Sequence, residues 1–285
     1  MLVAGTLFPV MGGFAKLLGQ DYSSFQISWA RAFGHIIFLS ALFLPRMGLS
    51  LFRSRRPGLQ LFRSAMLFTS NLNFFFAIKF IPLGKAAAIS LAAPLIVAAL
   101  AWPMLGERTT RARVIALLVG FVGVVVVIRP GTALFHWASV FVVISATAYG
   151  VYQILTRRIA GIDTPETSAL FSAFVGGFGM LLVLPFVWQT PASLLDVGLF
   201  IGVGIFGALG HYCVAHAFGY APANVLSPFQ YFQLLGSVTV GWLLFAEFPD
   251  VTTWIGAAVI VGSGLYTGWS QTGKRAARPG GGTRG

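Results

Sequence analysis

The sequence predicts an all-α integral membrane protein of ten transmembrane helices, arranged as a 5+5 inverted repeat. Three observations lead to this prediction: the composition, the recurrence of long apolar runs, and an internal similarity between the two halves of the chain. Of the 285 residues, 57% are hydrophobic and 9% are charged, whereas soluble proteins carry about 25% charged residues. Each apolar run is about 20 residues long, which is enough to cross a bilayer as a helix.

The internal similarity divides the chain into two related units. Residues 77–119 align with residues 217–259 without a gap, and the alignment places Glu107 on Glu247. Both stretches read as the end of a helix, a proline-containing turn, a long apolar helix, a glutamate and a further apolar helix. This shared order predicts a duplicated membrane unit.

Ten apolar helices follow one another along the chain. Their predicted ranges are 2–18, 23–45, 61–80, 84–105, 111–128, 137–157, 168–188, 195–218, 223–245 and 251–270. Short turns join them, among them Gln20-Asp21, Pro82-Leu83, Arg129-Pro130-Gly131, Ala221-Pro222 and Phe248-Pro249-Asp250, and Pro, Gly and Asp are typical of turns. The first repeat is therefore expected over residues 1–131 and the second over 132–270. Residues 271–285 are rich in Gly and Arg, which predicts a disordered cytoplasmic tail.

The basic residues predict the orientation in the membrane. With the N-terminus in the cytoplasm, fourteen Lys and Arg residues fall on the cytoplasmic side, and three, Lys79, Lys85 and Arg129, fall on the outer side. An excess of basic residues marks cytoplasmic loops, so we expect both termini in the cytoplasm. Because each unit has five helices, the second unit enters the membrane from the opposite side, and the repeat is inverted.

Several classes of function lack the residues that they need. The seven acidic residues, Asp21, Glu107, Asp163, Glu166, Asp196, Glu247 and Asp250, all fall in loops or at helix ends. We therefore expect no carboxylate inside the membrane that could act as a catalytic acid or base or bind a metal ion. Cys213 is the single cysteine, so no disulfide forms within one chain. The net charge of +12 lies in short loops and the tail, which indicates membrane orientation rather than nucleic-acid binding. No nucleotide motif is present, and no cofactor is expected.

Short motifs recur near the ends of the predicted helices. They are Trp29-Ala30-Arg31, Phe62-Arg63-Ser64, Pro94-Leu95-Ile96, Leu105-Gly106-Glu107-Arg108, Gly120-Phe121-Val122-Gly123-Val124 and Ile128-Arg129-Pro130-Gly131. With these motifs the chain resembles, over nearly its whole length, the EamA-type members of the drug/metabolite transporter superfamily. The resemblance implies an inner-membrane transporter with a central cavity lined by helices 1, 3, 4, 6, 8 and 9. The second repeat departs from the pattern, because Phe245-Ala246-Glu247-Phe248 lacks the Gly and the following Arg.

Polar residues at matched positions of the two repeats predict a substrate site. An offset of 140 residues places Asn71 on His211 and Ser90 on Gln230. Polar groups that face lipid are unfavourable, so we expect these side chains in a cavity between the halves, with Asn71 opposite His211 near the midplane. The expected lining is Asn71, Phe74, Phe75, Ile78, Ser90, Tyr149, Tyr152, Gln153, His211, Ala215, Gln230 and Tyr231. The alternative for each polar residue is a hydrogen bond that holds neighbouring helices together.

A second group of residues is expected to act as gates or hinges. It comprises Pro94, Glu107, Pro228 and Glu247. The alternative for the two glutamates is solvation of a helix end and local ion pairing. Lys16 is expected to extend to the lipid headgroups. Arg31 lies deeper, and it either pairs with backbone carbonyls or extends to the interface, or contacts a lipid or a substrate carboxylate.

The expected function is secondary transport of small metabolites across the inner membrane by alternating access. The resemblance favours export of amino acids, aromatic ones included, and it leaves import of riboflavin or S-adenosylmethionine as the alternative. A membrane-embedded enzyme or an assembly factor is disfavoured, because the chain has neither a clustered nucleophile and base nor a soluble domain. The expected partners are a small-molecule substrate and the lipid bilayer. The sequence leaves the oligomeric state open, and a monomer is compatible with it.

Overall fold

A computed structural model describes residues 1–105, 111–220 and 226–276 of the chain. The first half contains α1 (Leu2–Leu18), α2 (Ser24–Met47), the 3-10 helix η1 (Gly48–Phe52), α3 (Pro57–Ala77), α4 (Leu83–Ser90), α5 (Ala92–Leu105) and α6 (Arg111–Ile128). The second half contains α7 (Ala138–Ile159), α8 (Pro165–Phe171), η2 (Val175–Gly179), η3 (Met180–Leu182), α9 (Leu184–Val187), α10 (Leu194–Tyr220), η4 (Ser227–Tyr231), α12 (Phe232–Phe245) and α13 (Val251–Ala276). Most of the described residues are helical, and no strand occurs among them.

The predicted helix 84–105 is interrupted after Ser90, where α4 ends and α5 begins. Pro94, the third residue of α5, explains the interruption, because it has no N–H to donate to the carbonyl of Ser90. The predicted hinge at Pro94 therefore lies at a real discontinuity in the helix. Pro228 lies in η4, which also precedes a helix start, and Glu107 lies outside the described residues.

The predicted helix 168–188 is not continuous either. It consists of α8, the π-helical turn η2, the 3-10 turn η3 and the short helix α9. Glycines allow this segment to approach α2 closely: a Cβ on Gly176 would lie 2.8 Å from Ala32 Cβ, and one on Gly177 would lie 2.6 Å from Ile36 Cδ1. Pro185 lies in the first turn of α9 and has no N–H that could continue a helix from the preceding residues.

The C-terminal helix is longer than predicted. Helix α13 continues to Ala276, past the expected end at residue 270, so the first residues of the predicted disordered tail are helical. Gln271, Lys274, Arg275 and Ala276 have favourable helix propensities, and no proline occurs before Pro279. The remainder of the predicted tail lies outside the described residues.

The helices have lengths and compositions that suit a membrane. Four stretches in the described residues, 24–52, 83–100, 138–159 and 194–220, are long and apolar enough to cross one, and four shorter apolar helices accompany them. The outer faces are apolar as well: Ile115, Leu118 and Val122 of α6 are 60–61% exposed. A row of exposed aliphatic side chains on one helix face is typical of contact with lipid.

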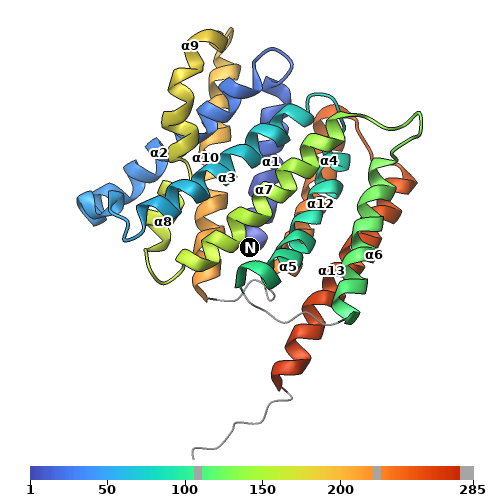
Figure 1. Ribbon diagram of the computed structural model, residues 1–285. Coiled ribbons are helices and arrows are strands. Elements are labelled where there is room, and N and C mark those ends of the chain that lie inside the picture. The colour runs from blue at the N-terminus through green and yellow to red at the C-terminus, as the bar shows by residue number, and fades with distance from the viewer. Residues whose placement is uncertain (106–110, 221–225, 277–285) are drawn as a thin grey trace, which may run out of the picture.

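The helices form a bundle in which the pairs α6–α13, α3–α7, α1–α10 and α2–α10 make the most extensive contacts. Figure 1 shows α6 and α13 side by side at one edge of the bundle. Small residues permit close approach at two crossings. A Cβ on Gly34 of α2 would lie 3.1 Å from Gly204 Cα of α10, and a Cβ on Gly123 of α6 would lie 2.9 Å from the carbonyl oxygen of Gly256 on α13.

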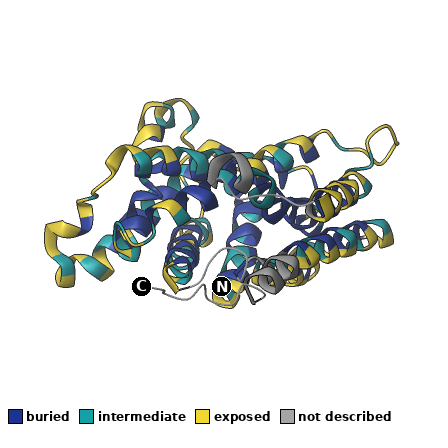
Figure 2. Ribbon diagram, turned by 60° about the horizontal axis from the view of Figure 1, so that its bottom comes forward, coloured by how far each residue is buried: buried dark blue, intermediate teal, exposed yellow. Residues whose placement is uncertain are grey.

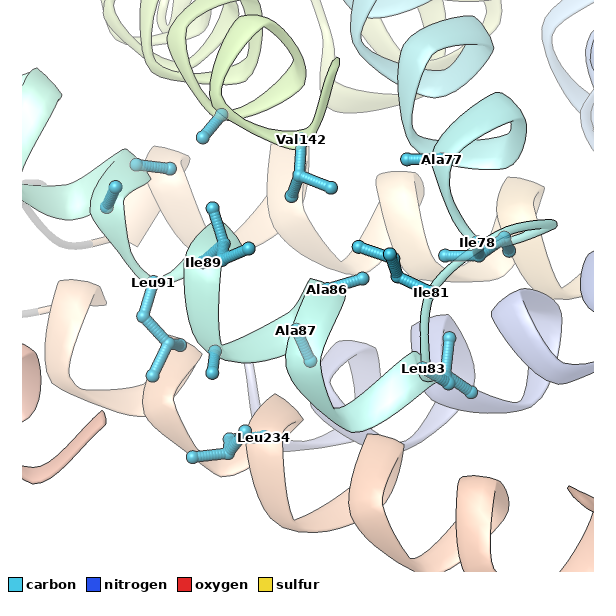
Figure 3. Close-up of a cluster of buried hydrophobic side chains, with 14 of the residues drawn as sticks. Ala77, Ile78, Ile81, Leu83, Ala86, Ala87, Ile89, Leu91, Val142 and Leu234 are labelled. Carbon is cyan, nitrogen blue, oxygen red and sulfur yellow. The ribbon is translucent and has the colours of Figure 1, made fainter. Parts of the chain in front are cut away.

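Burial is concentrated in the middle of the bundle, whereas the peripheral helices and loops are exposed (Figure 2). Figure 3 shows that the short helix α4 lies between α7 and α12, with Ala86 and Ile89 near Val142 on one side and Leu234 on the other. The broken helix α4–α5 of the first half is therefore held on both sides by side chains of the second half, next to the cavity described below.

Candidate functional site

A cavity of about 90 Å³ lies in the centre of the bundle. Side chains from α1, α3, α5, α7, α10, η4 and α12 line it, together with the end of α4. These elements lie within the first, third, fourth, sixth, eighth and ninth predicted helices. The wall carries aromatic and aliphatic groups, including Phe8, Phe74 and Tyr149, and a small number of polar side chains. Such a mixture suits a partly apolar small molecule.

The structure brings together half of the predicted lining residues and separates the others. Asn71, Phe74, Ser90, Tyr149, His211 and Gln230 line the cavity, and so does Pro94. Phe75 and Ile78, which belong to the same predicted face of α3, are fully buried in the hydrophobic core. A helix turns by about 100° per residue, so only part of that face is directed at the cavity.

Four further predicted lining residues lie away from the cavity. Tyr152 is fully buried, and its ring contacts the rings of Tyr149 and His211 with centroid distances of 5.6 and 5.8 Å. Gln153 exchanges two hydrogen bonds with Gln230, at 2.9 and 3.1 Å, and so supports the cavity wall. Ala215 lines a separate pocket between α7, α8 and α10. Tyr231 is directed at α13, where a Cβ on Gly264 would collide with its hydroxyl.

The two residue pairs related by the 140-residue offset, Asn71 with His211 and Ser90 with Gln230, line the same cavity. Asn71 Nδ2 donates to the Leu67 carbonyl at 2.7 Å, and Ser90 Oγ donates to the Ala86 carbonyl at 2.9 Å. These bonds within their own helices orient both side chains. The polar lining thus comes from both halves of the chain and faces one shared space.

An ion pair between a buried lysine and a partly exposed glutamate lies at one end of the bundle. Lys16 Nζ of α1 is 2.6 Å from both carboxylate oxygens of Glu247, and it also donates to the Ile81 carbonyl at 3.1 Å. The N–H of Leu83 donates to Glu247 Oε2 at 3.2 Å. The expectation that Lys16 extends to the headgroups is wrong, because Lys16 is only 8% exposed. A carboxylate 231 positions away in the sequence, which no local pattern reveals, accounts for the difference.

A polar network missed by the sequence analysis lies elsewhere, between α3, α7 and α8. Arg63 is fully buried, and its Nε and Nη1 donate to Gln60 Oε1 at 3.0 Å and Thr156 Oγ1 at 3.1 Å. Asp163, in the loop after α7, accepts from the backbone N–H of Arg55 and from Gln60 Nε2, both at 2.9 Å, and from Ser54 Oγ. Burial raises the pKa of the Asp163 carboxyl, but these hydrogen bonds outweigh it and lower that pKa below its ordinary value.

The fold and the cavity define a helical membrane protein with a central cavity lined by both halves of the chain. The sequence profile of the EamA-like transporter family matches residues 1–129 and 136–268. The chain therefore belongs to the EamA-like transporter family, within the drug/metabolite transporter superfamily, and is a multi-pass membrane protein.

Curated relatives match nearly the whole chain. An S-adenosylmethionine uptake transporter of Rickettsia prowazekii is 27% identical over 273 residues, which cover 95% of this chain and 90% of the relative. A riboflavin transporter of Rhizobium johnstonii is 28% identical, over 93% of this chain and 90% of its own. The pseudopaline exporter CntI of Pseudomonas aeruginosa is 27% identical, over 91% of each chain. These names indicate a transporter rather than an enzyme, and they include both directions of transport.

A solved structure also resembles this fold. It superposes with a TM-score of 0.65 at 19% identity, over 97% of this chain and 99% of the other. The resemblance concerns the fold alone.

Proposed function

We propose that this protein is a secondary transporter that moves small metabolites across the inner membrane by alternating access, and that it exports amino acids, aromatic ones included. The cavity is the observation on which the proposal rests. Its wall combines the aromatic rings of Phe8, Phe74 and Tyr149 with a few amide, hydroxyl and imidazole groups, a combination that favours a partly apolar molecule with hydrogen-bonding groups. Its position between the two halves is where inverted-repeat transporters bind their substrates.

Import of riboflavin or S-adenosylmethionine is the second candidate function. The observation in its favour is that relatives with these names match nearly the whole chain. The exporter among the relatives is about as similar, so identity alone does not choose a direction. Counterflow into proteoliposomes, with radiolabelled amino acids, riboflavin and S-adenosylmethionine as the panel, distinguishes the candidates by substrate. If none of these compounds exchanges, the proposal is wrong.

The Asn71→Leu variant is expected to weaken counterflow of the transported compound roughly tenfold or more, because the cavity then lacks a hydrogen-bonding group that the substrate needs. Asn73→Leu is the matched control. Asn73 makes the same bond to a carbonyl four residues earlier, Nδ2 to the Thr69 carbonyl at 2.7 Å, but it does not line the cavity. Equal transport by the two variants would show that Asn71 has no part in binding.

The proposed inverted repeat of ten helices places both termini on the same side of the membrane, and we propose that this side is the cytoplasm. Two family matches, over residues 1–129 and 136–268, support two units close to 1–131 and 132–270, and the distribution of basic residues supports the orientation. Reporter fusions after Arg56 and after Gly285 are expected to give cytoplasmic signals. A periplasmic signal from either fusion contradicts the proposed orientation.

A further inference from the structure

A group of buried polar side chains lies where α2 and α10 cross, beside the central cavity. Its members, called the Arg31 cluster, are Arg31 and His35 of α2, Tyr152 of α7 and His211 of α10. A Cβ on Gly207, one helical turn before His211, would lie 3.3 Å from Arg31 Cγ and 3.5 Å from Arg31 Nη1. The His211 ring lies 6.1 Å from that of His35 and 5.8 Å from that of Tyr152, centroid to centroid.

The Arg31 cluster is almost completely buried, yet several of its polar atoms have no hydrogen-bond partner among the described residues. Arg31 is 1% exposed. Its Nε and Nη1, the Tyr152 hydroxyl, and the Nδ1 atoms of His35 and His211 have no hydrogen-bond partner among the described residues. A buried guanidinium is strongly unfavourable unless an opposite charge or several acceptors compensate it. Several such atoms in one place therefore indicate a ligand rather than a packing defect.

Arg63 shows that this chain can satisfy a buried guanidinium by itself. It is as buried as Arg31, but Gln60, Thr156 and the Ser168 carbonyl accept hydrogen bonds from its three nitrogens. Its guanidinium carbon also lies 5.2 Å from the centre of the Tyr152 ring. Arg63 is thus a structural cation, whereas Arg31 retains free donors.

No carboxylate of the described residues compensates Arg31. The carboxylates with side-chain hydrogen bonds among the described residues have partners outside the Arg31 cluster: Asp163 with Gln60, Glu166 with Tyr212, Asp196 with Tyr22, Glu247 with Lys16 and Asp250 with Arg129. His211 belongs both to the Arg31 cluster and to the cavity wall. Arg31, His35 and Tyr152 lie behind this wall and do not line the cavity, so a bound molecule meets the cluster at His211, whose ring lies 5.8 Å from that of Tyr152.

We propose that the Arg31 cluster binds the carboxylate of the transported substrate, so that the substrate class is monocarboxylates with an apolar or aromatic remainder. This inference rests on the proposed function. A guanidinium offers two parallel N–H groups to the two oxygens of a carboxylate, and the Tyr152 hydroxyl is a further donor. His35 Nε2 already donates to the Ala169 carbonyl at 3.0 Å, so of the two imidazoles only that of His211 adds a donor. The apolar remainder then contacts Phe8, Phe74 and Tyr149.

Thermal unfolding of the purified, detergent-solubilised protein tests the inference without a transport assay. The probes are L-phenylalanine, L-tryptophan and benzoate, with L-phenylalaninamide as the probe that lacks a carboxylate. The carboxylates are expected to raise Tm and the amide is not. In the Arg31→Met variant the affinity for the carboxylates is expected to fall roughly 10- to 100-fold, because a charge-assisted bidentate contact is lost.

The ligand-free variants separate binding from folding. Arg31→Met removes a buried charge that the protein does not compensate, so its ligand-free Tm is expected to equal or exceed that of the wild type. Arg63→Met is the matched control and is expected to lower Tm, because Gln60, Thr156 and the Ser168 carbonyl lose their donor. A fall in Tm for both variants, with carboxylate stabilisation retained in Arg31→Met, would assign Arg31 a structural role and overturn the inference.

Three other outcomes also contradict the inference: no carboxylate changes Tm, the amide stabilises as well as the acid, or inorganic phosphate stabilises more than any carboxylate. Failure of the proposed function has a different signature, since no compound of the panel would then show counterflow. Transport of a neutral compound that Arg31→Met leaves unchanged refutes the carboxylate site and leaves the transporter function intact.

Discussion

The Glu247→Gln variant is expected to open the Lys16 end of the cavity. Glutamine keeps the shape of Glu247 but removes the charge that Lys16 Nζ meets at 2.6 Å. This contact joins the end of α1 to the end of α12, next to the turn that begins α4. A charge-assisted contact of this kind contributes about 1–2 kcal/mol when one partner remains partly exposed. In an alternating-access protein, the conformational equilibrium then shifts by roughly tenfold or more toward the state open at this end.

The shift can be measured by cysteine labelling. In a Cys213→Ser background, the substitution Ser90→Cys places a single thiol in the cavity wall. The rate at which a membrane-impermeant maleimide, added on the Glu247 side, labels this thiol reports access to the cavity. Glu247→Gln is expected to raise the labelling rate roughly tenfold. The matched control is Asp250→Asn, which breaks the ion pair with Arg129 between α6 and α13 and leaves the cavity region intact. If the two variants label at the same rate, the Lys16–Glu247 pair is not a gate.

Gly204→Ala is expected to destabilise the protein by about 2–3 kcal/mol or more. A Cβ at this position would lie 2.9 Å from Gly34 Cα and 3.1 Å from Gly34 C. Both neighbours are backbone atoms, so α2 and α10 must separate to accommodate the methyl group. Separation at this crossing also displaces Arg31 from Gly207, and we expect substrate binding to weaken with stability.

Gly198→Ala is the matched control on the same helix. A Cβ on Gly198 would meet no atom within 4 Å, and Ala is favoured over Gly in a helix by about 1 kcal/mol. The two substitutions are therefore expected to change Tm in opposite directions. A decrease of equal size in both would show that α10, rather than its contact with α2, is sensitive to substitution.

Local patterns in the sequence predicted the positions of most helices, because apolar length and turn residues determine them. The breaks were harder to predict. Pro94 and the glycines of residues 176–179 are visible in the sequence, but whether a helix bends or breaks there depends on its neighbours. The packing of Gly177 against Ile36 is one such contact between distant segments.

The 140-residue offset was the best guide to the lining of the cavity. It selected Asn71, Ser90, His211 and Gln230, and all four line one cavity. Helical spacing alone was a weaker guide, since it added Phe75 and Ile78, which lie in the core. The Lys16–Glu247 pair joins residues that are far apart in the sequence. The sequence does not predict the difference between Arg31 and Arg63 either, because it depends on which hydrogen-bond acceptors lie around each guanidinium.

The pairing of α6 with α13 has a consequence for biosynthesis. Helix α6 ends at Ile128, and its partner begins at Val251, so at 5–20 residues per second the ribosome needs roughly 10 s to deliver that partner. During this interval, the face of α6 that holds Gly123 against Gly256 has only lipid or other proteins beside it. This edge of the bundle closes last, and a chain that stops before α13 leaves α6 without its main partner.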